Sequence, residues 1–213
     1  MKRRELLKNL GLGVGVITLT PAVSSLLHSC SDGTSWKPVF FSKDQIILLS
    51  NLTELIIPSD DEVPGAKELN LTKFIDLYVI NMMVAKQQNL LKKAFDCFVE
   101  NCLSESNNSK INQITNEDLE SRLKYFFKDK VDSHKSWNSD FYKYSRDFES
   151  NQNNPPVVAL SYNFLNTIRR LTITSFKWSE TIGEKVLAYN PVPGRQVGCV
   201  DLNEATGGRA WSP

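Results

Sequence analysis

Apolar residues recur every three to four positions along most of the chain, from Ser42 to Tyr189. This spacing places them on one face of an α-helix, whereas a half-buried β-strand would require alternation. Breaks rich in asparagine, proline and glycine divide the pattern into segments. The chain is therefore predicted to be mainly α, with a single helical domain of six to seven helices over residues 42–189.

Local signals predict where these helices begin and end. Ser42 with Gln45 and Thr181 with Glu184 form capping-box patterns, and Pro58 ends the first apolar run. The predicted helical segments are about 42–57, 72–82, 91–102, 115–127, 137–148, 157–174 and a short last segment, 181–189. Their aromatic residues follow the apolar stripes and are expected to pack in the core.

Composition is that of an ordinary globular protein: 213 residues, 41% hydrophobic and 23% charged. The formal net charge of +1 hides an asymmetry. Residues 1–29 carry four basic residues against one acidic residue, which leaves a net charge of −2 on the rest of the chain. A mildly acidic chain is not expected to bind nucleic acid.

The N-terminus has the order of an export signal, with basic residues followed by an uncharged apolar run over 10–22. Adjacent Arg3 and Arg4 ahead of a weakly hydrophobic, glycine-rich stretch resemble a twin-arginine signal, which directs the export of folded proteins. The run is shorter than the ~20 apolar residues that a membrane-spanning helix needs. Residues 1–29 are therefore predicted to be a twin-arginine-type signal peptide.

The sequence Leu-Leu-His-Ser-Cys ending at Cys30 resembles a bacterial lipoprotein cleavage site, although His28 departs from the usual pattern. Two interpretations stay open. In one, Cys30 is diacylated and residues 30–41 tether a periplasmic, membrane-associated domain. In the other, Cys30 is a free cysteine in a linker that is cut elsewhere.

The last segment, 190–213, contains three of the nine prolines and four of the ten glycines, too many for a helix. It is predicted to be an extended, irregular C-terminal tail that ends near Trp211. Such a tail could lie across a partner protein or fold back over its own helices, and the sequence favours neither.

Residue types that usually carry chemistry are sparse. Of two histidines, one lies in the signal, and His134 is expected to be an ordinary surface residue. Cys102 continues an apolar stripe and is predicted to be a buried thiol, whereas Cys199 in the tail could bond a partner chain or Cys97. No catalytic, cofactor-binding or metal site is predicted.

Two motifs, read together, resemble the gluconate 2-dehydrogenase subunit 3 family. The first is Ile-Ile-Pro-Ser-Asp-Asp-Glu-Val-Pro-Gly-Ala at 56–66, followed by Phe-Ile-Asp at 74–76. The second is Trp-Ser-Glu at 178–180 with Leu-Ala-Tyr-Asn-Pro-Val-Pro-Gly at 187–194, continuing through Gly198 and Cys199. The resemblance covers essentially the whole chain after the signal.

The resemblance implies a non-catalytic small subunit of a membrane-associated, FAD-dependent gluconate or sugar dehydrogenase. FAD would lie in a large subunit similar to glucose-methanol-choline oxidoreductases, and a cytochrome c subunit with haem often accompanies it. The small subunit would assist folding and twin-arginine export of the large one. Contacts with the partner are expected at two segments. The first contains Pro58, Asp60, Pro64 and Gly65, and the second contains Pro191, Pro193, Gly194 and Trp211. Cys199 is a candidate for an intersubunit disulfide.

Two alternatives belong to other classes. One is a stand-alone exported lipoprotein that acts as a structural or interaction protein with an unrelated partner. The other is a hydrolase that uses carboxylates such as Asp60, Asp61 or Asp76 as acid and base.

Overall fold

The structure, a computed structural model, describes residues 36–106, 108–148, 154–192, 194 and 198–213. The helices among these described residues all lie in the compact unit that spans residues 38–213. Its helices are α3 (Lys43–Ile56), α4 (Leu71–Met82), α5 (Ala85–Ser106), α6 (Asn116–Lys124), α7 (His134–Arg146), α8 (Val157–Trp178) and α9 (Leu202–Thr206). Short turns intervene: 3-10 turns at Ile111–Gln113 and Val131–Ser133, and π-helical turns at Tyr125–Asp129 and Ile182–Val186. The prediction of a mainly α fold is confirmed.

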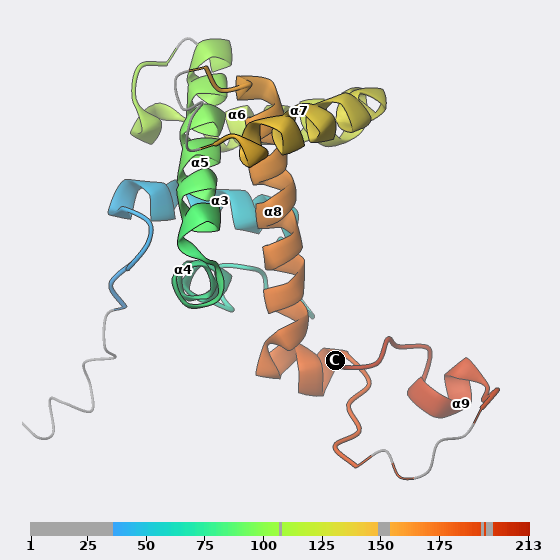
Figure 1. Cartoon of the computed structure of the whole chain (residues 1–213). Helices are drawn as coiled ribbons and strands as arrows, with labels where there is room; N and C mark the ends of the chain where they lie inside the picture. The colour runs from blue at the N-terminus through green and yellow to red at the C-terminus, as the bar shows by residue number, and fades with distance from the viewer. Residues whose placement is uncertain (1–35, 107, 149–153, 193, 195–197) are drawn as a thin grey trace, which may run out of the picture. The chain divides into compact units, whose positions relative to one another are not determined.

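Helices α5 and α8, each of 22 residues, make the most extensive helix pair and form the centre of the fold (Figure 1). Phe164 of α8 lies between two phenylalanines of α5, with ring centroids 5.1 Å from Phe95 and 5.2 Å from Phe98. All three rings are fully buried. The aromatic stripes are thus core, as predicted, and aromatic pairs add to the stability from area burial alone.

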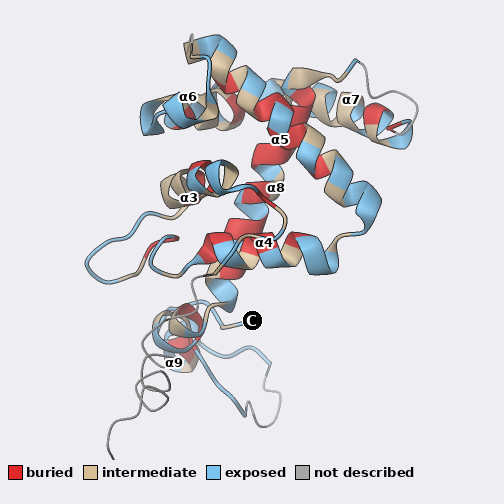
Figure 2. Ribbon diagram, turned by 90° about the vertical axis from the view of Figure 1, so that its left-hand side faces the viewer, coloured by how far each residue is buried: buried red, intermediate tan, exposed pale blue. Residues whose placement is uncertain are grey.

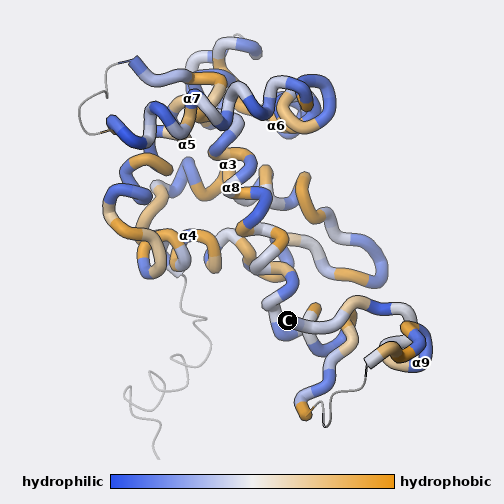
Figure 3. Tube along the Cα trace, turned by 45° about the vertical axis from the view of Figure 1, so that its right-hand side comes forward, coloured by the Kyte–Doolittle hydropathy of each residue, from blue (hydrophilic) through white to orange (hydrophobic). Residues whose placement is uncertain are grey.

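Helices α3, α4, α6 and α7 pack against this pair. Helices α3 and α4 pack on each other and on α8, and α7 packs on the first half of α8. Buried residues lie where the helices face one another (Figure 2). Hydrophobic and hydrophilic residues alternate along α3, α5 and α8, as expected for amphipathic helices (Figure 3).

The helix starts show both correct and incorrect predictions. Ser42 and Gln45 form the predicted capping box, and Thr115 caps α6 with Asp118 in the same way. The prediction of a capping box at Thr181 and Glu184 is wrong. Thr181 has helical backbone angles (φ −58°, ψ −44°) and makes no side-chain cap, since the helical backbone already begins at Glu180.

The β-branched residues near the end of α8 do not break it. Thr172 is buried, and its hydroxyl donates to the Ile168 carbonyl at 2.8 Å. Ser175 donates to the Thr172 carbonyl at 3.0 Å. Because each buried hydroxyl has an acceptor within the helix, it can lie in the core without an unsatisfied donor.

Asp76 joins the segment before α3 to the helical core. Its Oδ1 accepts hydrogen bonds from the backbone N–H groups of Phe40 (3.0 Å) and Phe41 (2.9 Å), and its Oδ2 accepts one from Val39 (2.8 Å). The Asp76 side chain is fully buried, and Phe41 packs against Phe95 in the core. Residues 39–41, predicted to be the end of a tether, are therefore part of the folded domain.

Substituting Asp76 tests this connection. We expect Asp76→Ala to lower the free energy of unfolding by about 3–5 kcal/mol, because three backbone donors lose a charged acceptor. Asp76→Asn keeps one acceptor oxygen and should cost less. Asp61→Ala, at an exposed carboxylate, is the matched control and should change stability by less than about 0.5 kcal/mol. Urea unfolding measures all three, and an Asp76→Ala cost no larger than the control's would contradict the assignment.

Candidate functional site

The loop that follows α3, residues 58–66, is held by its own backbone and by two carboxylates, Asp60 within it and Glu54 of α3, which accepts from the N–H groups of Ser59 (3.4 Å) and Lys67 (2.9 Å). Asp60 Oδ1 accepts from the N–H groups of Glu62 (2.8 Å) and Val63 (2.7 Å), and these two bonds lower the pKa of Asp60. At the far end, the Ala66 N–H donates to the Ile57 carbonyl at 3.0 Å. The loop is thus a fixed feature of the surface.

The four predicted contact residues of this loop differ in accessibility. Pro58 and Asp60 are exposed, Pro64 is half-buried and Gly65 is buried. A Cβ on Gly65 would lie 2.4 Å from the Ser59 backbone nitrogen, so the close approach of two chain segments requires glycine there. Gly65 therefore shapes the loop, and Pro58, Asp60 and part of Pro64 remain accessible at its surface.

The tail contains one helix that the composition argument did not predict. Asp201 caps α9 by accepting from the N–H groups of Asn203 and Glu204, and Gly207 follows the helix with a left-handed φ of 64°. These are an ordinary N-cap and C-terminal glycine, which the overall glycine and proline content obscured. Of the predicted tail contacts, Pro191 and Gly194 are exposed, and Pro193 lies outside the described residues.

The end of the tail returns to the segment after α8. The Ala188 N–H donates to the Ala210 carbonyl at 2.8 Å, and the Ser212 N–H donates to the Ala188 carbonyl at 3.0 Å. Together they make an isolated parallel β-bridge between Ala188 and Trp211. Of the two interpretations left open for the tail, folding back on its own chain therefore describes its last residues.

Three large aromatic side chains stay exposed where the tail returns: Trp178 (58%), Tyr189 (52%) and Trp211 (55%). We call them the C-terminal aromatic surface. Trp178 and Tyr189 line one cavity of about 330 Å³ together with Ser212, the neighbour of Trp211. Trp178 also packs edge-on against Phe74 of α4 (6.1 Å), so it is anchored at one side. Exposed aromatic residues that are held in place are typical of protein interfaces.

The carboxylates named for a hydrolase do not form an acid–base pair. Asp60 and Asp61 are exposed in the loop, whereas both oxygens of Asp76 are occupied by backbone N–H groups in the core. Among the described residues, no group of three or more His, Cys, Asp or Glu is placed to hold a metal ion.

A comparison with known protein families shows which family the chain belongs to. Residues 43–194 match the family described as gluconate 2-dehydrogenase subunit 3. The chain belongs to the gluconate 2-dehydrogenase subunit 3 family. No curated protein and no solved structure matches it.

The family match runs from the start of α3 to Gly194. In this family member it therefore includes the loop at 58–66 and two of the exposed aromatic residues, Trp178 and Tyr189. It leaves out α9 and Trp211. The sequence motifs pointed to Trp178 and Tyr189 without predicting that their rings are exposed.

Several predicted residues of this family member concern export and lie outside the described residues: Arg3, Arg4 and Cys30. In the part of the chain that the structure describes, no helix is both long and apolar enough to cross a membrane.

His134 is not the ordinary surface residue that was predicted. It is half-buried, its ring stacks on Tyr162 with centroids 4.5 Å apart, and its Nε2 lies 2.6 Å from the Phe126 carbonyl oxygen. Because a carbonyl oxygen only accepts, Nε2 carries the hydrogen. His134 therefore ties the start of α7 to the π-helical turn before it, a contact that comes from tertiary packing.

The three described cysteines are free thiols in different surroundings. Cys97 and Cys102 are buried on α5, as predicted for Cys102, while Cys199 is exposed in the tail. A bond between Cys199 and Cys97 is therefore absent. Burial raises the pKa of Cys97 to about 11 and that of Cys102 to about 12.

These surroundings predict thiol reactivity. In a Cys30→Ser background, we expect Ellman's reagent at pH 8 to modify one thiol per native chain within minutes, namely Cys199. Cys97 and Cys102 should react only after denaturation, because a buried neutral thiol is a poor nucleophile. A Cys199→Ser variant is the control, and its native chain should show no rapid modification. Rapid modification of two or three thiols in the native chain would contradict the burial of Cys97 and Cys102.

Proposed function

We propose that this chain is a non-catalytic accessory subunit of an FAD-dependent gluconate or sugar dehydrogenase. Membership of a family that is described as a dehydrogenase subunit carries the proposal. The carboxylate geometry agrees with it, since Asp76 serves the fold and is not available as a general base. FAD, and haem where a cytochrome c subunit takes part, would lie in the partner subunits.

The role would combine binding and export. The chain would bind the folded large subunit in the cytoplasm, carry it through the twin-arginine route by means of Arg3 and Arg4, and stay bound at the periplasmic face of the membrane. Diacylation of Cys30 would supply an anchor there. The C-terminal aromatic surface and the fixed loop at 58–66 are the surfaces we assign to the large subunit.

A gene deletion tests this role. Without the chain, we expect the flavoprotein and its dehydrogenase activity to fall at least about tenfold in the membrane fraction, because the large subunit loses its export signal. The wild-type gene should restore both, and so should the conservative control Lys2→Arg. Arg3→Lys with Arg4→Lys should not. A flavoprotein that reaches the membrane normally in the deletion strain would refute the proposal.

Cys199 provides a second, separable prediction. Its exposed thiol in the tail is expected to form an intersubunit disulfide in the native complex. A non-reducing gel should show one band at the combined mass of the two subunits, which reductant or Cys199→Ser abolishes. Cys102→Ser, at a buried thiol, should leave the band in place. An identical band pattern with and without reductant would eliminate this bond and leave the accessory role untouched.

A further inference from the structure

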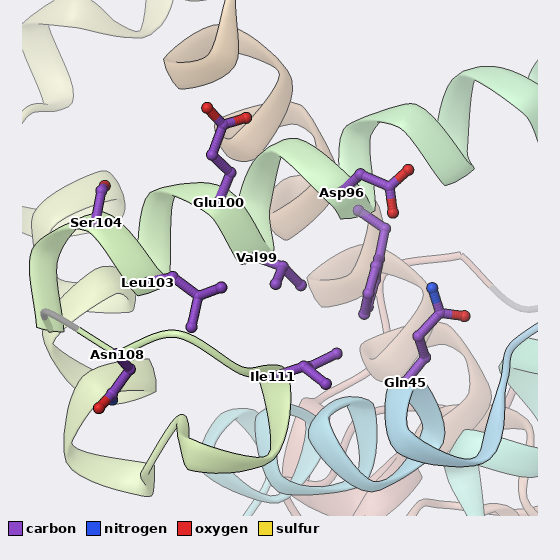
Figure 4. Close-up of a pocket in the computed structure, with 9 residues that line it drawn as sticks. Gln45, Asp96, Val99, Glu100, Leu103, Ser104, Asn108 and Ile111 are labelled. Atoms are coloured by element: carbon purple, nitrogen blue, oxygen red, sulfur yellow. The ribbon is translucent and has the colours of Figure 1, made fainter.

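A second surface, apart from the tail and the 58–66 loop, has the form of a docking groove. It is an open cavity of about 530 Å³ between α5, the segment 108–111 and the start of α3. Phe95, Val99 and Leu103 line it from successive turns of α5. Figure 4 shows Val99 and Leu103 directed toward Ile111 across the groove.

The apolar surface formed by Val99, Leu103 and Ile111 continues beyond this cavity. Ile111 also lines a smaller cavity of about 110 Å³ beside α3, together with Ile47 and Asn51. The Ile47 side chain is 62% exposed, while Val99, Leu103 and Ile111 are half-buried. Contiguous apolar surface of this kind, bordered by polar groups, is typical of a protein-binding site.

The charged side chains that line the groove are all acidic. The residues that line the two cavities include the carboxylates Asp44, Asp96 and Glu100, and none of the lining residues is a lysine, arginine or histidine. Burial raises the pKa of Asp96, an effect that the nearby Lys93 opposes. A basic side chain placed beside Asp96 would therefore meet a carboxylate whose charge is only partly compensated.

We infer that this acid-rimmed groove binds an amphipathic helix of the partner dehydrogenase subunit. The helix would place apolar side chains on Val99, Leu103 and Ile111, with lysine or arginine side chains beside Asp96 and Glu100. Asp96 and Glu100, like Val99 and Leu103, are four residues apart, so two parallel rows run along α5 and match the repeat of a second helix. A second copy of this chain fits less well, since groove against groove would oppose carboxylates.

The inference rests on the proposed function, which supplies the partner. A photo-crosslinking residue, benzoylphenylalanine, at exposed Ser104 on the groove border tests it in the full complex. We expect a crosslink to the flavoprotein that maps to a helical segment with both apolar and basic residues. The same replacement at Ser139, which is exposed on α7 and lines neither cavity, is the matched control and should give no crosslink to that segment.

A charge reversal gives an independent measurement. Asp96→Lys with Glu100→Lys should raise the dissociation constant for the flavoprotein roughly tenfold or more, because like charges would then face each other. Asp129→Lys with Asp132→Lys makes the same change in net charge away from the groove and should have little effect. Thermal unfolding of both double variants verifies that they fold. The crosslinking experiment keeps Asp96 and Glu100 unchanged, so it does not depend on the folding of these variants.

The outcomes separate the two proposals. A flavoprotein that binds both double variants equally, without a crosslink from position 104, would overturn the groove and leave the accessory role standing. Failure of the wild-type chain to recover any flavoprotein would overturn both. A crosslink to a different protein, or to a second copy of this chain, would also overturn the assignment of the groove.

Discussion

The buried carboxylate of Asp76 is the interaction on which the arrangement of the first helices depends. It lies on α4 and accepts hydrogen bonds from three consecutive residues, 39–41, which lead into α3. These bonds place Phe41 against Phe95 of α5 and so join the chain entry, α4 and α5 in one core. A buried charge is tolerated here because three donors compensate for its lost hydration.

Around the central pair of α5 and α8, two kinds of exposed surface remain, and these are the ones we assign to partners. One is aromatic: Trp178, Tyr189 and Trp211 are exposed, while the bridge at Ala188 and a contact with Phe74 hold their positions. The other is the acid-rimmed groove along α5, where apolar side chains lie beside carboxylates. An aromatic surface suits affinity, and a groove whose charged lining residues are all acidic suits selection of the partner. Both are compatible with a subunit that binds another protein.

Local features of this fold could be predicted from the sequence, and long-range ones could not. The helical repeat and the caps at Ser42 and Thr115 involve residues three or four apart, so the sequence shows them directly. The partners of Asp76 lie 35–37 residues away, and nothing near Asp76 in the chain identifies them. His134 likewise pairs with rings that only the tertiary fold brings close. At Thr181 the pattern was present, but the helical backbone begins one residue earlier. Both partner surfaces depend on exposure in three dimensions, which the family motifs only partly indicated.

We propose above all that this chain works as a bound subunit of a flavoprotein dehydrogenase. Native mass spectrometry of the chain, immunoprecipitated from detergent-solubilised membranes of its own organism, measures whether it is bound in such a complex. We expect a complex with one large subunit and one FAD per chain, together with a flavin absorption spectrum. Recovery of the chain alone, without a large subunit or flavin, would contradict it.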